Sequence, residues 1–180
     1  MAKSSRVPRK GTDMELTHRR RLSVIARLLA PLSAVLTGLL AGGMGFIEVV
    51  LLPFWRGSSP AEFRQWFTDH SDRIRNVMIP LGVSAGAVST AYALTQVADR
   101  RPNGAATIAA ATTLGVIAIT VTVNEPANHQ FTAGALTDAE TRNLLDKWAR
   151  WHHLRVALGI VATTAAAFAS HQRQVHLNEK

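Results

Sequence analysis

Four long stretches of this 180-residue chain are apolar and almost free of charge. A helix needs about 20 apolar residues to cross the hydrocarbon core of a bilayer, and three of the stretches meet that requirement. The fourth is somewhat shorter and follows a Trp-rich flank of the kind found at membrane interfaces. None shows the polar stripe that a helix of a soluble bundle carries. The stretches are residues 28–52, in which Glu48 is the only charge, 77–98, 105–123 and 156–170.

We therefore predict an all-α integral membrane protein, folded as a four-helix bundle that crosses the lipid bilayer four times. The four-span domain would cover residues 25–172. Before it, residues 1–24 mix Ser, Pro, Gly and basic side chains without apolar periodicity, which predicts a disordered basic tail. Residues 173–180 would form a short C-terminal tail.

Each of the two longer loops carries a helix-start signal. In the first loop Ser59 precedes Pro60, and Glu62 follows three residues after the serine. In the second loop Thr137 and Glu140 have the same spacing. Ser or Thr followed by Glu at this distance forms a capping box, and Pro favours the first helical position. We expect a short extra helix in each loop that runs into the next span, so that one order of elements occurs twice.

The net charge of +8 is concentrated in the N-terminal tail rather than in a stripe on a folded domain. That distribution argues against nucleic-acid binding and follows the positive-inside pattern of membrane proteins. The short loop with Arg100 and Arg101 and the C-terminal tail are also basic. We therefore expect a multi-pass protein of the cell membrane with both termini in the cytoplasm. The absence of cysteine excludes disulfides, thiolate metal ligands and thiol nucleophiles.

The same three side chains occur twice at one spacing, each time just before a span. His follows Trp by four residues and Arg follows His by three, so a helix would present all three on one face. Trp and Arg at such a place are ordinary interface anchors. An Arg close to the hydrocarbon is also a candidate functional residue, because its charge is costly there. The first row is Trp66, His70 and Arg73, and the second is Trp148, His152 and Arg155, with Trp151 on the same face.

Two further polar features lie toward the same end of the bundle. Glu48 is an isolated carboxylate near the end of the first span, so we expect it to face the interior and pair with an Arg or a His. The segment VNEPANHQF follows the third span and places Asn124 and Asn128 four residues apart. If the helix continues past Pro126, the two amides share a face, where they would hold a ligand carbonyl or cap the helix. With both rows, these residues would line an outward-facing pocket that Glu48 closes.

The order of a span, VNEPANHQF, a polar helix and WARWHHLR resembles the membrane family that includes the anthrone oxygenases. The resemblance is best in the C-terminal third of the chain and loose in the first half. It implies a four-span fold with a site near the outer ends of the last two spans. The residues that carry it are Asn124, Asn128, Trp148, Trp151, His152 and Arg155.

The activity that the resemblance implies is a cofactor-independent oxygenation of a flat, apolar aromatic substrate of the anthrone or phenol type. Such a substrate is deprotonated, and its delocalised carbanion reacts with dioxygen to give a quinone. In that scheme His152 would take the proton and Arg155 would stabilise the enolate charge. Trp148 and Trp151 would stack on the rings, and the two Asn side chains would hold the oxygens. Glu48 and the first row would complete the binding site.

Two other classes of function are compatible with the same residues. A metal-dependent membrane oxidoreductase would use His70, His152 and Glu48, with His129 as a further candidate, to hold a single iron, copper or zinc ion. A non-catalytic scaffold or binding protein would need none of these side chains. Its spans would pack closely, or form a homodimer, through small residues four apart, as at Gly38 and Gly42 and at Gly82 and Gly86.

The metal content of the detergent-purified protein separates the two enzyme classes. We expect no stoichiometric metal in the wild-type chain, because the sequence has no short two-His motif among these candidates. Mass spectrometry of the wild type and of His152→Ala provides the measurement. One metal ion per chain that disappears in His152→Ala would make the protein a metalloenzyme and contradict the cofactor-free scheme.

Overall fold

In the computed structural model, which describes residues 10–178, the chain consists of helices joined by short turns, and this range contains no strand. Four helical rods are long and apolar enough to cross a membrane: Arg21–Gly57, Pro60–Ala98, Gly104–Thr132 and Asp138–Val175. The predicted all-α, four-span fold is confirmed. In chain order the elements are α1 (Lys10–Phe46), η1 (Ile47–Leu51), α2 (Leu52–Gly57), α3 (Pro60–Ala98), α4 (Gly104–Ile119), η2 (Thr120–Asn124), α5 (Glu125–Thr132) and α6 (Asp138–Asn178).

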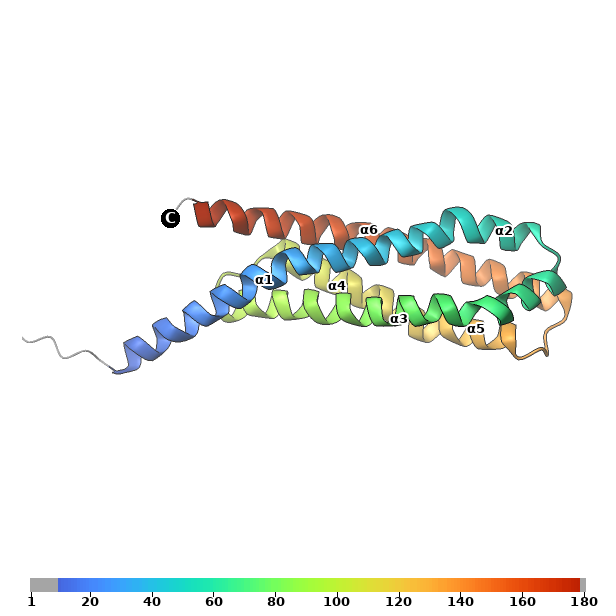
Figure 1. The fold of residues 1–180 in the computed structure, drawn as a ribbon, viewed down its shortest axis with the longest axis horizontal. Coiled ribbons are helices and arrows are strands. Elements are labelled where there is room, and N and C mark those ends of the chain that lie inside the picture. The colour runs from blue at the N-terminus through green and yellow to red at the C-terminus, as the bar shows by residue number, and fades with distance from the viewer. Residues whose placement is uncertain (1–9, 179–180) are drawn as a thin grey trace, which may run out of the picture.

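The four rods form one bundle in which each rod packs against two neighbours (Figure 1). Helix α1 lies beside α3 and α6, and α4 packs between the same two helices to complete the square. Successive rods run up and down, as the short connections require. The two ends of the described chain and the turn between α3 and α4 lie at one end of the bundle. The α2–α3 and α5–α6 connections lie at the other, which we call the outer end.

Helix α1 begins at Lys10, inside the segment for which we predicted disorder. Residues 10–24 continue the first span as helix, and they include Arg, Leu, Met and Glu, which are good helix formers. The part of the predicted tail before Lys10 lies outside the described residues. At the other terminus α6 continues to Asn178, and the guanidinium of Arg173 donates to the carbonyl of Ser23 at 2.7 Å. This bond ties the first and last helices together.

Two π-helical turns, η1 and η2, interrupt the rods at equivalent places in the two halves of the chain. In the first, the N–H of Leu52, which precedes Pro53, donates to the carbonyl five residues earlier. In the second, the N–H of Glu125, which precedes Pro126, does the same. Proline supplies no N–H to a helix, and the wider turn before it lets the rod continue. The order of span, π-turn, proline-containing helix and capped helix therefore occurs twice.

Both predicted capping boxes are present at the outer end. The Ser59 side chain accepts from the backbone N–H of Glu62, whose carboxylate accepts from the backbone N–H of Ser59. Thr137 and Glu140 make the same exchange, with the Thr137 nitrogen 2.8 Å from the Glu140 carboxylate. The helices that begin here are the first turns of α3 and α6, continuous with the spans that follow.

Side-chain contacts join the two loops of the outer end. Arg64 of α3 donates to the hydroxyl of Thr141 at 2.6 Å and to the carboxylate of Asp138 at 3.0 Å. Arg56 of α2 pairs with Asp146 of α6 at 3.2 Å. Exposed ion pairs contribute at most about 1 kcal/mol each, so their main effect is to align the two helix starts.

The interior changes character along the bundle. Toward the outer end, Trp55 is buried among aromatic rings, with centroids 5.7 Å away at Phe67 and 5.5 Å away at Trp148. Toward the termini the buried residues are small, and Tyr92 donates its hydroxyl to the carbonyl of Ala169 at 3.3 Å. Large rings hold the helices apart at one end, and alanines let them approach at the other.

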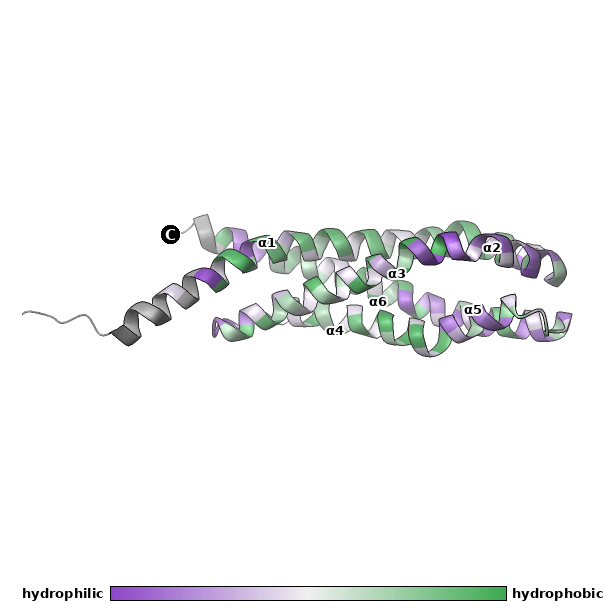
Figure 2. Cartoon of the chain, turned by 60° about the horizontal axis from the view of Figure 1, so that its bottom comes forward, coloured by the Kyte–Doolittle hydropathy of each residue, from purple (hydrophilic) through white to green (hydrophobic). Residues whose placement is uncertain are grey.

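The outward surface of the rods is apolar over the spans. Between 28% and 33% of the most apolar segment of each rod is buried inside the bundle, so most of its residues are at least partly exposed. Figure 2 shows hydrophobic residues along the middle of the rods and hydrophilic residues toward the outer end. A surface of this kind is stable in contact with lipid and would be unfavourable in water.

Close helix packing at glycine occurs partly where the sequence predicts it. A Cβ atom on Gly86 would lie 2.6 Å from a side chain of α4, whereas Gly42 faces open space. Helix α6 approaches α1 at Gly159, where an added Cβ would lie 2.6 Å from Met44 and 3.4 Å from Ala41. The contact between the first and last helices therefore depends on a glycine outside the predicted pairs.

Replacing Gly159 with Val is expected to destabilise the bundle by about 1–3 kcal/mol, because the branched side chain forces α1 away. Thermal unfolding in detergent, followed by circular dichroism, provides the measurement. The matched control is Gly42→Val, which adds the same atoms in open space. Equal loss of stability in the two variants would show that the approach at Gly159 is unimportant.

Candidate functional site

A guanidinium is buried at the level of the second π-helical turn. Arg155 of α6 is 8% exposed, and its Nη1 donates to the hydroxyl of Thr120 at 3.0 Å. Its Cζ lies 5.5 Å from the ring centroid of Trp148. Its Nε has no hydrogen-bond partner, and among the described residues no carboxylate forms an ion pair with it. Buried charges are normally paired, so Arg155 has unused capacity to bind an anion.

His152 holds this guanidinium from behind. Its ring is fully buried and stacks on Trp148, with centroids 4.7 Å apart. Nη2 of Arg155 lies 2.6 Å from Nδ1 and can only donate, so Nδ1 accepts. The proton therefore sits on Nε2, which donates to the carbonyl of Met44 at 3.1 Å. Both ring nitrogens are engaged, and the imidazole is neutral.

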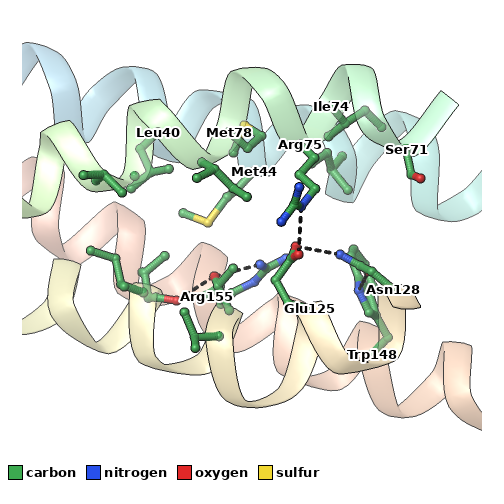
Figure 3. A pocket seen from close by; sticks show the side chains of 18 of the residues that line it. Leu40, Met44, Ser71, Ile74, Arg75, Met78, Glu125, Asn128, Trp148 and Arg155 are labelled. Carbon is green, nitrogen blue, oxygen red and sulfur yellow. Dashed lines mark hydrogen bonds and ion pairs between the residues drawn. The ribbon is translucent and has the colours of Figure 1, made fainter. Parts of the chain in front are cut away.

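A carboxylate lies in a hydrogen-bond chain at the start of α5. One oxygen of Glu125 accepts from Nε of Arg75 at 3.1 Å, and the other accepts from the amide of Asn128 at 3.0 Å. The indole N–H of Trp148 donates to the Asn128 amide oxygen at 2.9 Å. Figure 3 shows these residues together with Arg155, contributed by α3, α5 and α6. In this hydrogen-bond chain, Trp148 orients the amide of Asn128, and Asn128 and Arg75 orient the carboxylate of Glu125.

These polar residues line one side of a cavity of about 190 Å³ between the four rods. Its other walls are largely apolar, with Leu40 and Met44 from α1 and Met78 from α3. Ile79 of α3 and Val121 of η2 line it as well, and both are exposed. A largely apolar pocket with a few convergent polar groups is typical of a small-molecule site, and this one is lined in part by exposed apolar residues of α3 and η2.

The second predicted row divides between the cavity and its surroundings. Trp148 and Arg155 line the cavity, and His152 lies behind them. Trp151 is 38% exposed on the outer surface of α6, so it does not form a second plate beside Trp148. Trp148, His152 and Arg155 are in contact with one another, as their spacing on one helix face predicts. The expectation of two stacking Trp rings in one pocket was wrong.

The two asparagines share a helix face, because the helix does continue past Pro126. Asn124 is buried, and its amide donates to the backbone carbonyl of Trp148 at 3.4 Å, while its oxygen has no partner. Asn128 lines the cavity, but both ends of its amide are engaged. Both residues thus position Trp148.

The first predicted row lies outside the cavity. Trp66 packs against Trp55 and stacks on His70, whose Nδ1 donates to the Trp66 carbonyl at 2.8 Å. Arg73 is exposed. The expectation that both rows line one pocket is therefore wrong. Trp66 follows its cap, Ser59, by seven residues, whereas the second Trp follows its cap by eleven, which places the second row about one helical turn deeper.

Glu48 lies in η1 and is not among the residues that line the cavity. Its carboxylate contacts Nδ1 of His153 at 2.7 Å and Nε2 of His152 at 3.7 Å. It pairs with histidine, as one of the predicted alternatives states, but it does not close the cavity. Within the described chain no three His, Asp or Glu side chains gather as a metal-binding group, so Glu48, His152 and His70 do not form one site.

Sequence reasoning missed Glu125 and Arg75. Glu125 lies two residues after the charge-free third span and precedes Pro126, so its position near the membrane boundary was visible in the sequence. Arg75 lies just before the second span. Their pairing was not visible, because it joins two helices that are far apart in the sequence.

Replacing Trp148 with Phe is expected to destabilise the protein by about 1–2 kcal/mol, because the Asn128 oxygen loses its donor while a ring still fills the space. The matched control is Trp151→Phe, for which we expect a change within about 0.5 kcal/mol at this exposed position. Thermal unfolding in detergent checks both. A stable Trp148→Phe variant would mean that the indole N–H contributes little to holding Asn128.

The chain was compared with family models, with curated proteins and with solved structures, and one family model matches it. A family model described as anthrone oxygenase matches residues 69–165, more than half of the chain. The matched region includes Arg75, Thr120, Glu125, Asn128, Trp148, His152 and Arg155. No curated protein and no solved structure matches the chain.

Proposed function

Since this chain belongs to the anthrone oxygenase family and is an oxygenase-like, multi-pass membrane protein, we propose that its cavity oxidises a compact aromatic compound of the anthrone or phenol type. The proposed reaction uses dioxygen and needs neither a metal nor an organic cofactor. In an anthrone-like substrate, the methylene group beside the ring system becomes a carbonyl. One dioxygen is consumed and one water is released, which balances the two hydrogens lost from carbon.

The observation that carries this proposal is the unpaired charge of Arg155. Loss of a proton from the substrate creates an enolate or phenolate, whose negative charge is delocalised onto oxygen. Arg155 lines the cavity, and its buried Nε–H has no hydrogen-bond partner in the protein. A preorganised cation in a water-poor site stabilises such an oxyanion strongly, because no solvent has to be reorganised.

The size and lining of the cavity favour a small apolar substrate. Its volume of about 190 Å³ is below the roughly 300–1,000 Å³ of sites for drug-sized ligands. The face of the Trp148 ring is occupied by His152 on one side, which favours edge contact or one-sided stacking with a flat substrate. Ile79 and Val121 line the cavity and are exposed, so the proposed route of such a substrate is from the lipid past these two side chains.

The same proposal includes an orientation in the membrane. The turn between α3 and α4 carries Arg100 and Arg101, and it lies at the end of the bundle where the described chain begins and ends. The positive-inside pattern favours this end in the cytoplasm. The cavity, which lies toward the outer end, would then be closer to the opposite leaflet.

Oxygen uptake tests the proposed activity. Purified protein in detergent is supplied with anthrone, and dioxygen consumption is followed with an electrode while the quinone is quantified by its absorbance. We expect one quinone per dioxygen, and a rate at least about 100-fold lower in Arg155→Leu. Uncatalysed oxidation is measured with heat-inactivated protein.

The matched control is Arg150→Leu, which removes an exposed arginine five residues earlier on the same helix and is expected to leave the rate unchanged. Wild-type oxygen uptake no faster than the uncatalysed reaction, or a full rate in Arg155→Leu, would contradict the proposal.

A further inference from the structure

The proposed reaction requires a base that presents a free lone pair to the cavity. His152, which the sequence favoured for this role, does not meet the requirement. Its Nδ1 accepts from Arg155, its Nε2–H donates to Met44, and its ring is fully buried behind the cavity wall. Protonation of Nδ1 would break the contact with Arg155 and place two cations side by side. His152 is therefore a positioning residue for Arg155.

Glu125 meets the requirement. Its side chain lines the cavity and is 19% exposed. Each carboxylate oxygen has two lone pairs, and the contacts with Arg75 and Asn128 use one on each oxygen. One lone pair on each oxygen is left. From this geometry we propose that Glu125 is the general base that removes the proton from the substrate carbon.

The neighbours of Glu125 hold it in a form suited to this task. Arg75 holds one carboxylate oxygen in an ion pair, with its Nε 3.1 Å from that oxygen. Asn128, oriented in turn by the indole of Trp148, fixes the rotation of the carboxylate. Such a constraint raises the efficiency of proton transfer, since the lone pair is already aimed.

In this proposal Glu125 accepts the substrate proton, and Arg155 stabilises the negative charge that remains on the substrate. Both line the same cavity, and they interact electrostatically without forming an ion pair. A substrate between them would place its acidic carbon toward Glu125 and its carbonyl oxygen toward Arg155. Paired groups of this kind stabilise both products of the proton transfer.

The inference rests on the proposed function for its substrate, and its steps balance. Glu125 accepts a proton from the methylene carbon, and the C–H electron pair becomes an enolate whose oxygen faces Arg155. Dioxygen takes up the enolate electrons and bonds to that carbon, and the resulting peroxide anion accepts the proton that Glu125 holds. The carboxylate then removes the remaining C–H proton as the O–O bond breaks. Hydroxide leaves and takes that proton as water, and a carbonyl remains on the carbon.

Anaerobic ionisation of the substrate tests Glu125 without the oxygen step. Anthrone is mixed with the protein in the absence of dioxygen, and the red-shifted absorbance of its anion is followed by stopped flow. Binding of neutral anthrone is measured separately by quenching of tryptophan fluorescence. In Glu125→Gln we expect binding within a few-fold of wild type, and a rate of ionisation lower by about 100-fold or more.

Arg75→Gln is the matched control, because it removes the same ion pair and leaves the carboxylate in place. If Glu125 served only to hold α3 against α5, both variants would behave alike. In Arg75→Gln we expect the rate of substrate ionisation to stay within about 10-fold of wild type, because the base is present but its orientation is less fixed. Equal loss in the two variants, or ionisation at the wild-type rate in Glu125→Gln, would overturn the assignment.

A shorter carboxylate covers the case in which Glu125→Gln does not fold. Glu125→Asp keeps the charge but withdraws the oxygens by one methylene, so we expect binding to persist and ionisation to slow by about 10-fold or more. Unchanged ionisation in this variant would overturn the assignment.

The readouts also separate this inference from the proposed function. If substrate ionisation depends on Glu125 but no oxygen uptake occurs, the proposed oxygenase activity is refuted and the assignment of Glu125 as base is retained. Oxygen uptake that is unaffected in Glu125→Gln would keep the oxygenase and refute the base.

Discussion

The contact between Arg155 and a neutral histidine is the interaction on which the rest of the site depends. A guanidinium that is 8% exposed within an apolar bundle needs partners, and a carboxylate would be the usual choice. Here the partners are the His152 ring nitrogen, the Thr120 hydroxyl and the face of Trp148, none of which carries a negative charge. They hold the side chain in place without neutralising it. Among the described residues, the positive charge is therefore left without a carboxylate in ion-pair contact.

The doubled order of elements explains why the same row of side chains has two different roles. Both halves contain a span, a π-turn, a proline-containing helix and a capped helix, yet the second row lies about one turn deeper below its cap than the first. At the shallower level, Trp66 and His70 join the aromatic cluster around Trp55 and stabilise the outer end. At the deeper level, Arg155 meets the cavity beside η2. A difference of four residues thus separates a row that packs in the aromatic cluster from a row that reaches the cavity.

The π-turn before Pro126 connects the fold to the site. The proline would interrupt a regular helix, and the wider turn accommodates it while α5 continues in the same rod. As a result Asn124 and Asn128 both face Trp148, and Glu125 faces the cavity. The equivalent turn before Pro53 carries Glu48, which faces His153 instead. The two halves share a backbone device, and only one of them directs a carboxylate into the cavity.

Local signals in the sequence determined the spans, the two capping boxes, the tolerance of Pro126 and the closeness of Trp148, His152 and Arg155. Each of these depends on residues within a few turns of one helix, where spacing alone fixes the geometry. Only the tertiary structure decided that Glu125 pairs with Arg75, that Met44 and Arg155 occupy both nitrogens of His152, and that Trp151 faces outward. These outcomes depend on the rotation of one rod against its neighbours, which is set by packing over the whole bundle. No local pattern in the chain encodes it.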